Sequence, residues 1–349
     1  MRVTGNPNLE RCIIKGKYVG YVTSYDPLYD FLGGITRDLI GVREPHPAFR
    51  AFRLRGSNEV YAYEEKFSGT KIVCKFYGAK FASNPGAAAE VAQREYDNLN
   101  MLRGYNLTGS PHHVIQPLAL RPDINSVLAV EYFPGEELAH AITRATHHCD
   151  DAYLFSRLTA LAYFLATQHN RTANGATVDF EPVCNYFDGI IDKLLSRGRI
   201  GRWDVEEFSW LRDIWSDRNH MWEDRQVWLH GDATPTNFLF GPGIDVAAID
   251  LERSKYGDRV FDVGRLAGEL QHAFMITTGH KHRAEPFIGH FLREYCGHLP
   301  DRDHVFEEVT ARVPYYMGLT LLRIARNDYI TNDYCGKLIR QAKRLLRAP

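Results

Sequence analysis

Residues 227–237 read VWLHGDATPTN, and residues 246–252 read VAAIDLE. Each run starts as a short apolar strand and reaches an aspartate, Asp232 in the first run and Asp250 in the second. Asn237 follows Asp232 by five residues, a spacing at which a loop can turn the amide toward the same point. Because loops at strand ends commonly carry function, the two runs predict one site with two carboxylates and an amide.

This set of side chains suits phosphoryl transfer, which needs few protein groups. Asp232 would orient and deprotonate an attacking hydroxyl, while Asn237 and Asp250 would hold the magnesium ions that neutralise a triphosphate. A plain turn is the alternative for an isolated His-Gly-Asp, since Gly-Asp is a common turn pair. The order of the two runs favours the catalytic interpretation.

HGDATPTN followed by IDLE resembles the aminoglycoside phosphotransferase and choline kinase superfamily, whose pattern is HxDxxxxN and then [IV]-D-[WFL]-E. The resemblance implies an α+β, protein-kinase-like, two-lobed fold, with a small β-rich N-lobe and a larger, mainly helical C-lobe. It covers residues 54 to about 275 and implies further parts upstream in a fixed order. One departure is Gly231, where choline kinases usually carry asparagine.

The first upstream part is a nucleotide loop in residues 54–63, which resemble the family's G-x-S-N-x-V-Y segment. Gly56 would let the backbone approach phosphates, and Ser57 and Asn58 would hydrogen-bond them. A hairpin turn is the alternative for this segment.

The second part is a lysine on an inner strand. Residues 72–77 alternate with one apolar face, and Lys75 lies 19 residues after Gly56, as the resemblance implies for a lysine that contacts the nucleotide phosphates. An ordinary solvent-facing lysine is the alternative, and Lys71 and Lys80 are competing candidates.

The third part is an acidic partner for this lysine. Residues 87–102 have apolar residues at helical spacing, and Glu95 in this helix matches the family's pairing position. Glu90 is the alternative partner.

The fourth part is the hinge segment. Residues 127–135 read VLAVEYFPG, a buried strand that ends in a Pro-Gly break and resembles the family's E-[YF]-[ILF]-x-G hinge. The resemblance implies that backbone groups from Glu131 to Phe133 hydrogen-bond the adenine.

Two further residues are predicted to support the site. Asp262 lies in a segment that resembles the family's G-D-P-x-x-D-[LV] pattern, with Arg259 in place of the usual proline. We expect a buried Asp262 to hold the loop, through His230 or through backbone amides, and not to react.

The sequence predicts an N-terminal lobe at residues 1–133, with an extension at 1–50 that has no family counterpart, and a C-terminal lobe at residues 134–349. A helix over 153–169 is expected in the core of the C-lobe. A second helix is expected over 204–222, capped by Asp204 with Glu207. Residues 337–347 predict a basic amphipathic helix, which argues against a polycationic acceptor.

The composition fits a cytoplasmic enzyme. Lys plus Arg is 42 and Asp plus Glu is 43 among 349 residues, so no broad nucleic-acid or membrane binding is expected. The start of the chain lacks the apolar core of a signal peptide, and six scattered cysteines form no CxxC pair, which argues against a disulfide scaffold and a zinc site.

The predicted activity is that of an ATP- and magnesium-dependent kinase acting on a hydroxyl of a small molecule. A non-catalytic nucleotide-binding pseudokinase or scaffold is the alternative, although such a protein would be expected to lack Asp232, Asn237 or Asp250. A protein kinase is a further option, but no Ala-Pro-Glu segment follows Asp250. The acceptor, the oligomeric state and the choice between ATP and GTP stay open.

Overall fold

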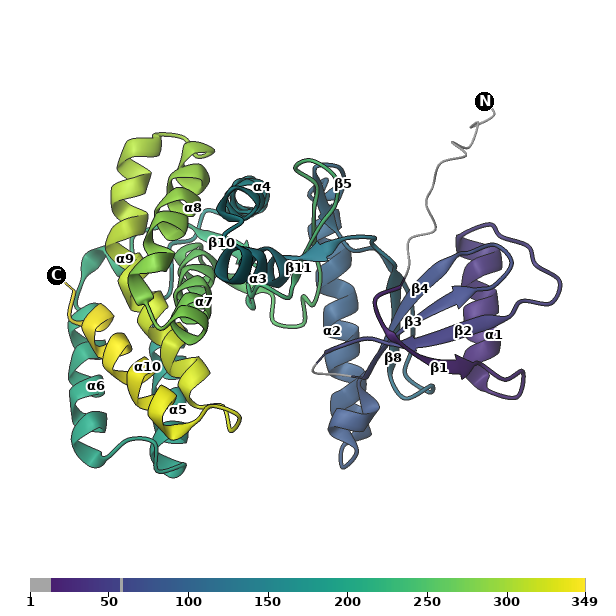
Figure 1. Cartoon of the computed structure of the whole chain (residues 1–349), viewed down its shortest axis with the longest axis horizontal. Helices are drawn as coiled ribbons and strands as arrows, with labels where there is room; N and C mark the ends of the chain where they lie inside the picture. Colours follow the sequence, from purple (N-terminus) through teal and green to yellow (C-terminus); the bar gives the residue numbers. More distant parts are fainter. Residues whose placement is uncertain (1–13, 57–58, 349) are drawn as a thin grey trace. The chain divides into compact units, whose positions relative to one another are not determined.

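The computed structural model describes residues 14–56 and 59–348, and the chain divides into two units (Figure 1). Unit 1 contains the residues up to Thr108 together with Val114–Pro134. Unit 2 contains Gly109–His113 together with the residues from Gly135 onward. The main boundary therefore falls within the Pro-Gly break that ends the hinge segment.

Unit 1 is built on a six-stranded antiparallel sheet with the strand order β1-β2-β3-β4-β8-β7. Its strands are β1 (Lys17–Tyr21), β2 (Phe49–Arg53), β3 (Glu59–Glu65), β4 (Lys71–Phe76), β7 (Pro117–Arg121) and β8 (Val127–Glu131). Its helices are α1 (Pro27–Gly34), a π-helical continuation η1 (Ile35–Leu39), the 3-10 turn η2 (Gly78–Phe81) and α2 (Pro85–Arg103).

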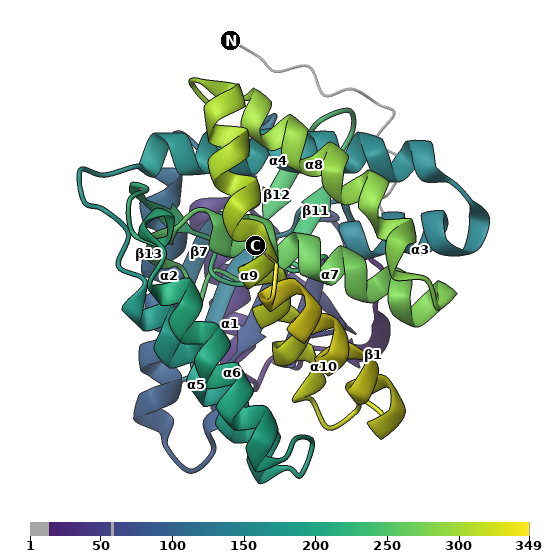
Figure 2. The same ribbon diagram turned by 90° about the vertical axis from the view of Figure 1, so that its left-hand side faces the viewer.

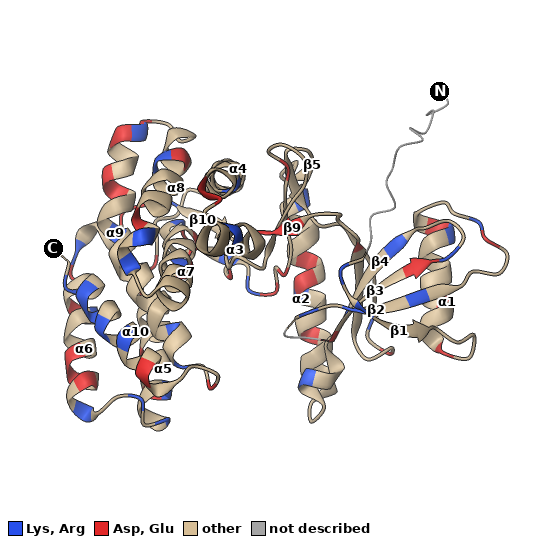
Figure 3. Ribbon diagram, in the orientation of Figure 1, with Lys and Arg blue, Asp and Glu red and all other residues tan. Residues whose placement is uncertain are grey.

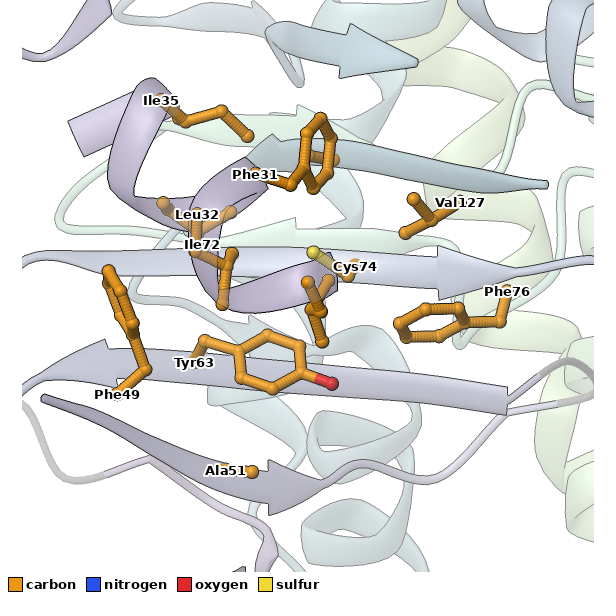
Figure 4. Packing of buried hydrophobic residues seen from close by; sticks show 12 residues of the cluster. Phe31, Leu32, Ile35, Phe49, Ala51, Tyr63, Ile72, Cys74, Phe76 and Val127 are labelled. Atoms are coloured by element: carbon orange, nitrogen blue, oxygen red, sulfur yellow. The ribbon is translucent and has the colours of Figure 1, made fainter. Parts of the chain in front are cut away.

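The two faces of this sheet serve different purposes. Successive residues of a strand point to opposite faces. On β4 the even-numbered residues pack with α1 in a hydrophobic cluster (Figure 4), which includes Phe31, Leu32, Phe49, Tyr63, Ile72, Cys74, Phe76 and Val127. Lys75 therefore points to the other face, where it meets α2.

Helix α2 begins two residues before the predicted start, at Pro85. Asn84 is the N-cap, and its side chain accepts a hydrogen bond from the Ala87 backbone N–H at 3.2 Å. Proline at the first helical position needs no backbone hydrogen bond, so an Asn-Pro start is favourable. The predicted start is later because it rests on the spacing of the apolar residues and not on the N-cap residue, Asn84.

Unit 2 is mainly helical (Figure 2). Its helices are α3 (Leu138–His148), α4 (Asp151–Thr172), α5 (Glu181–Ser196), α6 (Arg202–Ser216), η3 (Asn219–Met221), α7 (Val260–Thr278), η4 (Lys281–Ala284), α8 (Glu285–Gly297), α9 (Arg302–Ala325) and α10 (Asn332–Leu346). None of the helices within 14–56 and 59–348 has the length and apolar character that a membrane span requires.

Short strands carry the loops of unit 2. The strand β10 (Gln226–Leu229) pairs with β13 (Lys255–Asp258), and β11 (Phe238–Phe240) lies between β12 (Val246–Ala248) and β9 (Glu136–Glu137), all antiparallel. Two more short strands, β5 (Thr108–Gly109) and β6 (His112–Val114), extend the sheet beyond β12.

Helices α7 and α9 of unit 2 cross closely. α7 packs against α9, and α9 packs against α10 (Figure 2). A Cβ atom on Gly264 of α7 would lie 2.4 Å from the Cβ of Tyr316 on α9, so only glycine permits this approach. The close contact fixes α7, which carries residues of the site, against α9.

The predicted helix over 204–222 is wrong in its bounds and its cap. Helix α6 starts at Arg202 and ends at Ser216, and its N-cap is Gly201. Asp204 occupies the third helical position, where its carboxylate accepts a hydrogen bond from the Gly201 backbone N–H at 2.9 Å. An acidic residue at that position is the other half of a capping box, which the sequence does not distinguish from a cap.

The basic helix predicted near the C-terminus is present as α10, and part of its charge is neutralised within unit 2. Lys343 lies 2.6 Å from Asp204 and 2.7 Å from Glu207 of α6, and Arg347 also pairs with Glu207. Figure 3 shows the Lys and Arg residues along α10 and the acidic residues of α6. These pairs give the positive charge of α10 a role within the fold.

Candidate active site

The loop after β10 starts with a conformation that requires glycine. Gly231 has a φ of 78°, and a Cβ atom there would lie 2.1 Å from the Arg253 carbonyl oxygen. Asparagine tolerates a positive φ, but its Cβ would clash with that backbone atom. The backbone of residues 253–254 therefore requires glycine at position 231, where choline kinases usually carry asparagine.

Asp262 stabilises the start of the same loop by accepting hydrogen bonds from two of its backbone amides. Its carboxylate accepts hydrogen bonds from the backbone N–H groups of His230 at 2.6 Å and Gly231 at 3.0 Å, and it lies 3.4 Å from His169 Nε2. Burial alone would raise the pKa of Asp262, but its hydrogen bonds to His169 and to the His230 amide hold that pKa below its usual range. Burial also lowers the pKa of His169.

Asn237 ties the other end of the loop to its start. The amide Nδ2 donates to the Asp232 carbonyl oxygen at 2.9 Å, which leaves the amide oxygen turned away from that bond. The Ile249 backbone N–H donates to the Asn237 carbonyl oxygen at 3.1 Å, in line with the pairing of β11 and β12. Asn237 therefore lies directly before β11 at the hairpin end where Asp250 follows β12.

Asp250 itself adopts a left-handed conformation, with a φ of 64°. Aspartate is one of the few non-glycine residues that occupy this region readily. The turn that follows β12 therefore sets the position of the Asp250 carboxylate.

The Asp232 carboxylate lies beside two arginines that the sequence analysis did not identify, the buried Arg265 and the partly exposed Arg323. Arg265 Nη1 lies 2.8 Å from Asp232 Oδ1 and also donates to the Gly231 carbonyl oxygen at 2.7 Å. Arg323 Nη1 lies 3.8 Å from the same carboxylate oxygen, and Arg323 also pairs with Glu269. Arg265 lies one helical turn after Asp262, and this spacing was the available signal; Arg323 comes from the distant helix α9.

In unit 1, Lys75 is held by Glu95. Lys75 Nζ lies 2.6 Å from Glu95 Oε2, and the Tyr77 hydroxyl donates to the same oxygen. Glu95 is 1% exposed, whereas the alternative partner Glu90 is exposed. The tyrosine is a partner that the sequence analysis did not propose.

The competing lysines have other surroundings. Lys71 lies 3.8 Å from Glu64, and Lys80 is exposed.

The remaining predicted nucleotide-binding residues are placed only in part. Gly56 is exposed in the bend that follows β2, and Ser57 and Asn58 lie outside the described residues. Glu131 ends β8, where its side chain accepts from the Gln116 backbone N–H at 2.5 Å. Phe133 follows in the segment that leads to the Pro-Gly break.

Comparison with protein families matches residues 48–305 to the phosphotransferase enzyme family. No curated protein sequence matches the chain.

Solved structures with a similar fold were also found. An ethanolamine kinase from Plasmodium vivax is 13% identical with a TM-score of 0.59, over 90% of this chain and 88% of that one. The ADP-bound aminoglycoside phosphotransferase APH(2'')-Ib is 13% identical with a TM-score of 0.54, over 92% and 96%. Choline kinase LicA from Streptococcus pneumoniae is 14% identical with a TM-score of 0.54, over 91% and 98%. These likenesses confirm the predicted α+β, protein-kinase-like fold.

Proposed function

Because the chain belongs to the phosphotransferase enzyme family, we propose that it transfers the γ-phosphate of ATP to a hydroxyl group of a small molecule. The observation that carries this proposal is the loop from His230 to Asn237. Both of its ends are fixed, by Asp262 at the start and by Asn237 at the end, next to the turn that follows β12 and contains Asp250. A fixed set of two carboxylates and an amide is what positioning a phosphoryl transfer requires.

Asp232 is the residue that we assign to the acceptor. The acceptor oxygen attacks the γ-phosphorus, its proton passes to the Asp232 carboxylate, and the bond to the β,γ-bridging oxygen breaks to release ADP. The 19% exposure of the Asp232 side chain supports this role, since a sealed carboxylate could not meet an acceptor. Arg265 fixes the orientation of the Asp232 side chain by donating a hydrogen bond to Oδ1.

Asn237 and Asp250 fit a magnesium ion by their chemistry. Both offer oxygen atoms, which Mg²⁺ prefers, and the Asn237 amide nitrogen is already used by the Asp232 carbonyl, which leaves its oxygen as the ligand atom. When bound, magnesium neutralises the charge of the triphosphate.

Unit 1 supplies the proposed nucleotide contacts. Lys75, oriented by Glu95, would contact the α- and β-phosphates, and the segment from Glu131 to Phe133 would contact the adenine. Gly56, Ser57 and Asn58 complete the proposed set. The neighbouring structures support ATP as the donor, because one is described as ADP-bound and another as a ternary complex with streptomycin and ATP.

The test is ATP turnover against a panel of sugars, amino alcohols, nucleosides, hydroxy acids and antibiotics, with the phosphorylated product identified by mass spectrometry. We expect one class of acceptor to stimulate turnover, and we expect chelation of magnesium to abolish it. Turnover that persists without a divalent cation would overturn the metal assignment. Nucleotide binding without turnover on any acceptor would favour a non-catalytic protein.

A further inference from the structure

Three charged side chains of unit 2 form one group with the proposed catalytic carboxylate, Asp232. Arg265 and Glu269 lie one turn apart on α7, and Arg323 comes from α9. Arg265 binds Asp232, and Arg323 binds Glu269 and lies 3.8 Å from Asp232. Two guanidinium groups thus lie beside the point where the acceptor hydroxyl would react.

Two polar atoms of this region are buried without a hydrogen-bond partner in the described part of the chain. They are Arg323 Nε and the hydroxyl oxygen of Tyr186 on α5. An unpaired buried polar atom costs about 1–3 kcal/mol, and in a native structure it calls for a ligand or a water molecule.

Tyr186 and the arginines belong to the same locality. The Tyr186 ring lies 6.3 Å from the Phe261 ring, and the Arg265 guanidinium lies over Phe261 at 4.6 Å. The two unpaired atoms are therefore close to the same charged group.

This group is partly open to solvent. The exposed fractions of the side chains are 19% for Asp232, 15% for Arg323 and 13% for Glu269, whereas Arg265 is 4% exposed. Arg265 is therefore the inner support of Asp232, and Arg323 is the arginine that a small molecule can reach.

We propose that the acceptor carries an anionic group, a carboxylate or a phosphate, and that Arg323 and the Tyr186 hydroxyl bind it while the acceptor presents its hydroxyl to Asp232. This inference rests on the proposed function and specifies its substrate class. A guanidinium offers several N–H donors in a planar fork that matches an oxyanion. Glu269 and Asp232 engage the Nη atoms of Arg323, so the Nε edge supplies the additional donor.

An ammonium group is disfavoured at the same position. It would have to approach Arg323 and Arg265, and like charges at close range repel. Glu269 could attract a cation only by giving up its pairing with Arg323, which would leave a buried guanidinium without its carboxylate.

The first test compares four hexose derivatives with the wild-type protein in the presence of Mg-ATP: gluconate, glucose 6-phosphate, glucose and glucosamine. The four compounds have similar hydroxyl-bearing skeletons. Gluconate carries a carboxylate, glucose 6-phosphate a phosphate and glucosamine an ammonium group, whereas glucose is uncharged. Both phosphorylation and the shift in melting temperature are measured for each compound. We expect an anion to react or to stabilise best, and the two anionic compounds distinguish carboxylate from phosphate. Preference for glucosamine or glucose, or no response to either anion in both measurements, overturns the proposal.

The second test removes one hydroxyl. Tyr186→Phe should not lower the melting temperature of the free protein, because that hydroxyl has no partner within the described chain. The KM or Kd for the anionic compound should rise about tenfold or more, as expected for the loss of a hydrogen bond to a charged group. Tyr315→Phe is the matched control, since its hydroxyl is also buried without a partner but lies among Phe187 and Trp215. Equal effects of the two variants contradict the proposal.

The third test is Arg323→Lys, which keeps a positive charge beside Glu269 but removes the Nε donor and the planar fork. Binding of the anion should weaken, so that the anion raises the melting temperature less than it does in the wild-type protein. Unchanged binding of the anion contradicts the proposal. Absence of ATP turnover in the wild-type protein would instead contradict the proposed function, and the shift in melting temperature would still decide whether the anion binds.

Discussion

The charged groups around Lys75 and around Asp232 are built on different principles. In unit 1 a single lysine, Lys75, is held by one carboxylate and one tyrosine, Glu95 and Tyr77. In unit 2 the Asp232 carboxylate is held by a group that contains two arginines and a second carboxylate. A lysine amine is a flexible point charge, whereas an arginine fixes its partner through a planar fork. The first arrangement suits contact with a phosphate chain, and the second suits a carboxylate that must keep one orientation.

The largest effect that separates the two centres is expected for Arg265→Met. The change leaves Asp232 and the Gly231 carbonyl without their buried donor, and the loss of one partner of a buried pair costs about 3–5 kcal/mol. Because water can reach Asp232, we expect a loss near the lower end, about 3 kcal/mol in the free energy of unfolding, measured by chemical denaturation.

Arg253→Met is the matched control for this change. Arg253 lies 3.8 Å from Glu252 and its side chain is 47% exposed, so its removal should cost less than about 1 kcal/mol. Similar losses for the two variants would mean that Arg265 does not support Asp232.

The second prediction concerns the coupling of Lys75 with Glu95. Lys75→Met and Glu95→Gln should each raise the KM for ATP and lower kcat, and the double variant should lose less than the sum of the two. The interaction free energy of such a buried contact pair is about 0.5–3 kcal/mol. Steady-state kinetics of the three variants gives this value, with the exposed Glu90→Gln as the control. Fully additive losses would show that Glu95 does not orient Lys75.

The third prediction concerns acid, to which the loop of unit 2 should be sensitive. His169 has a pKa lowered by burial, and the pKa of Asp262 is held below its usual range by its hydrogen bonds. A group with a lowered pKa in the folded state stabilises the fold above its unfolded pKa, and that contribution is lost as the pH falls. The free energy of unfolding should therefore fall below about pH 6.5, where unfolded histidine becomes protonated, and fall further below about pH 4, where unfolded aspartate does.

Denaturation at several pH values tests this prediction. The loss from pH 7 to pH 5.5 should become smaller in His169→Gln, which cannot be protonated there. A variant with the same pH dependence as the wild-type protein would show that His169 is not the group responsible.

The sequence was sufficient for parts that depend on local spacing. Asp232 follows β10, Asn237 and Asp250 flank the paired strands β11 and β12, and Lys75 and Glu95 lie on a strand and a helix near in the chain. Apolar periodicity also located α4 and α10. The fold class followed from the order of these motifs.

The remainder depends on contacts between distant segments. Arg323 reaches Asp232 only because Gly264 allows α7 and α9 to cross closely, and no local pattern contains that information. The bounds of α6 were wrong because an acidic residue in the third position of a helix resembles a cap. The basic residues near the C-terminus could not be assigned to Asp204 and Glu207 before the packing of α10 was known.

The central claim is that Asp232 accepts the proton of the acceptor hydroxyl, and Asp232→Asn tests it most directly. The amide keeps the size of the side chain and an oxygen for Arg265, but it is a poor base. We predict a kcat lower by about 10²- to 10⁴-fold, with the Kd for ATP nearly unchanged. Asp245→Asn, at the turn between β11 and β12, is the matched control and should retain activity. An Asp232→Asn variant with the kcat of the wild-type protein would contradict the account.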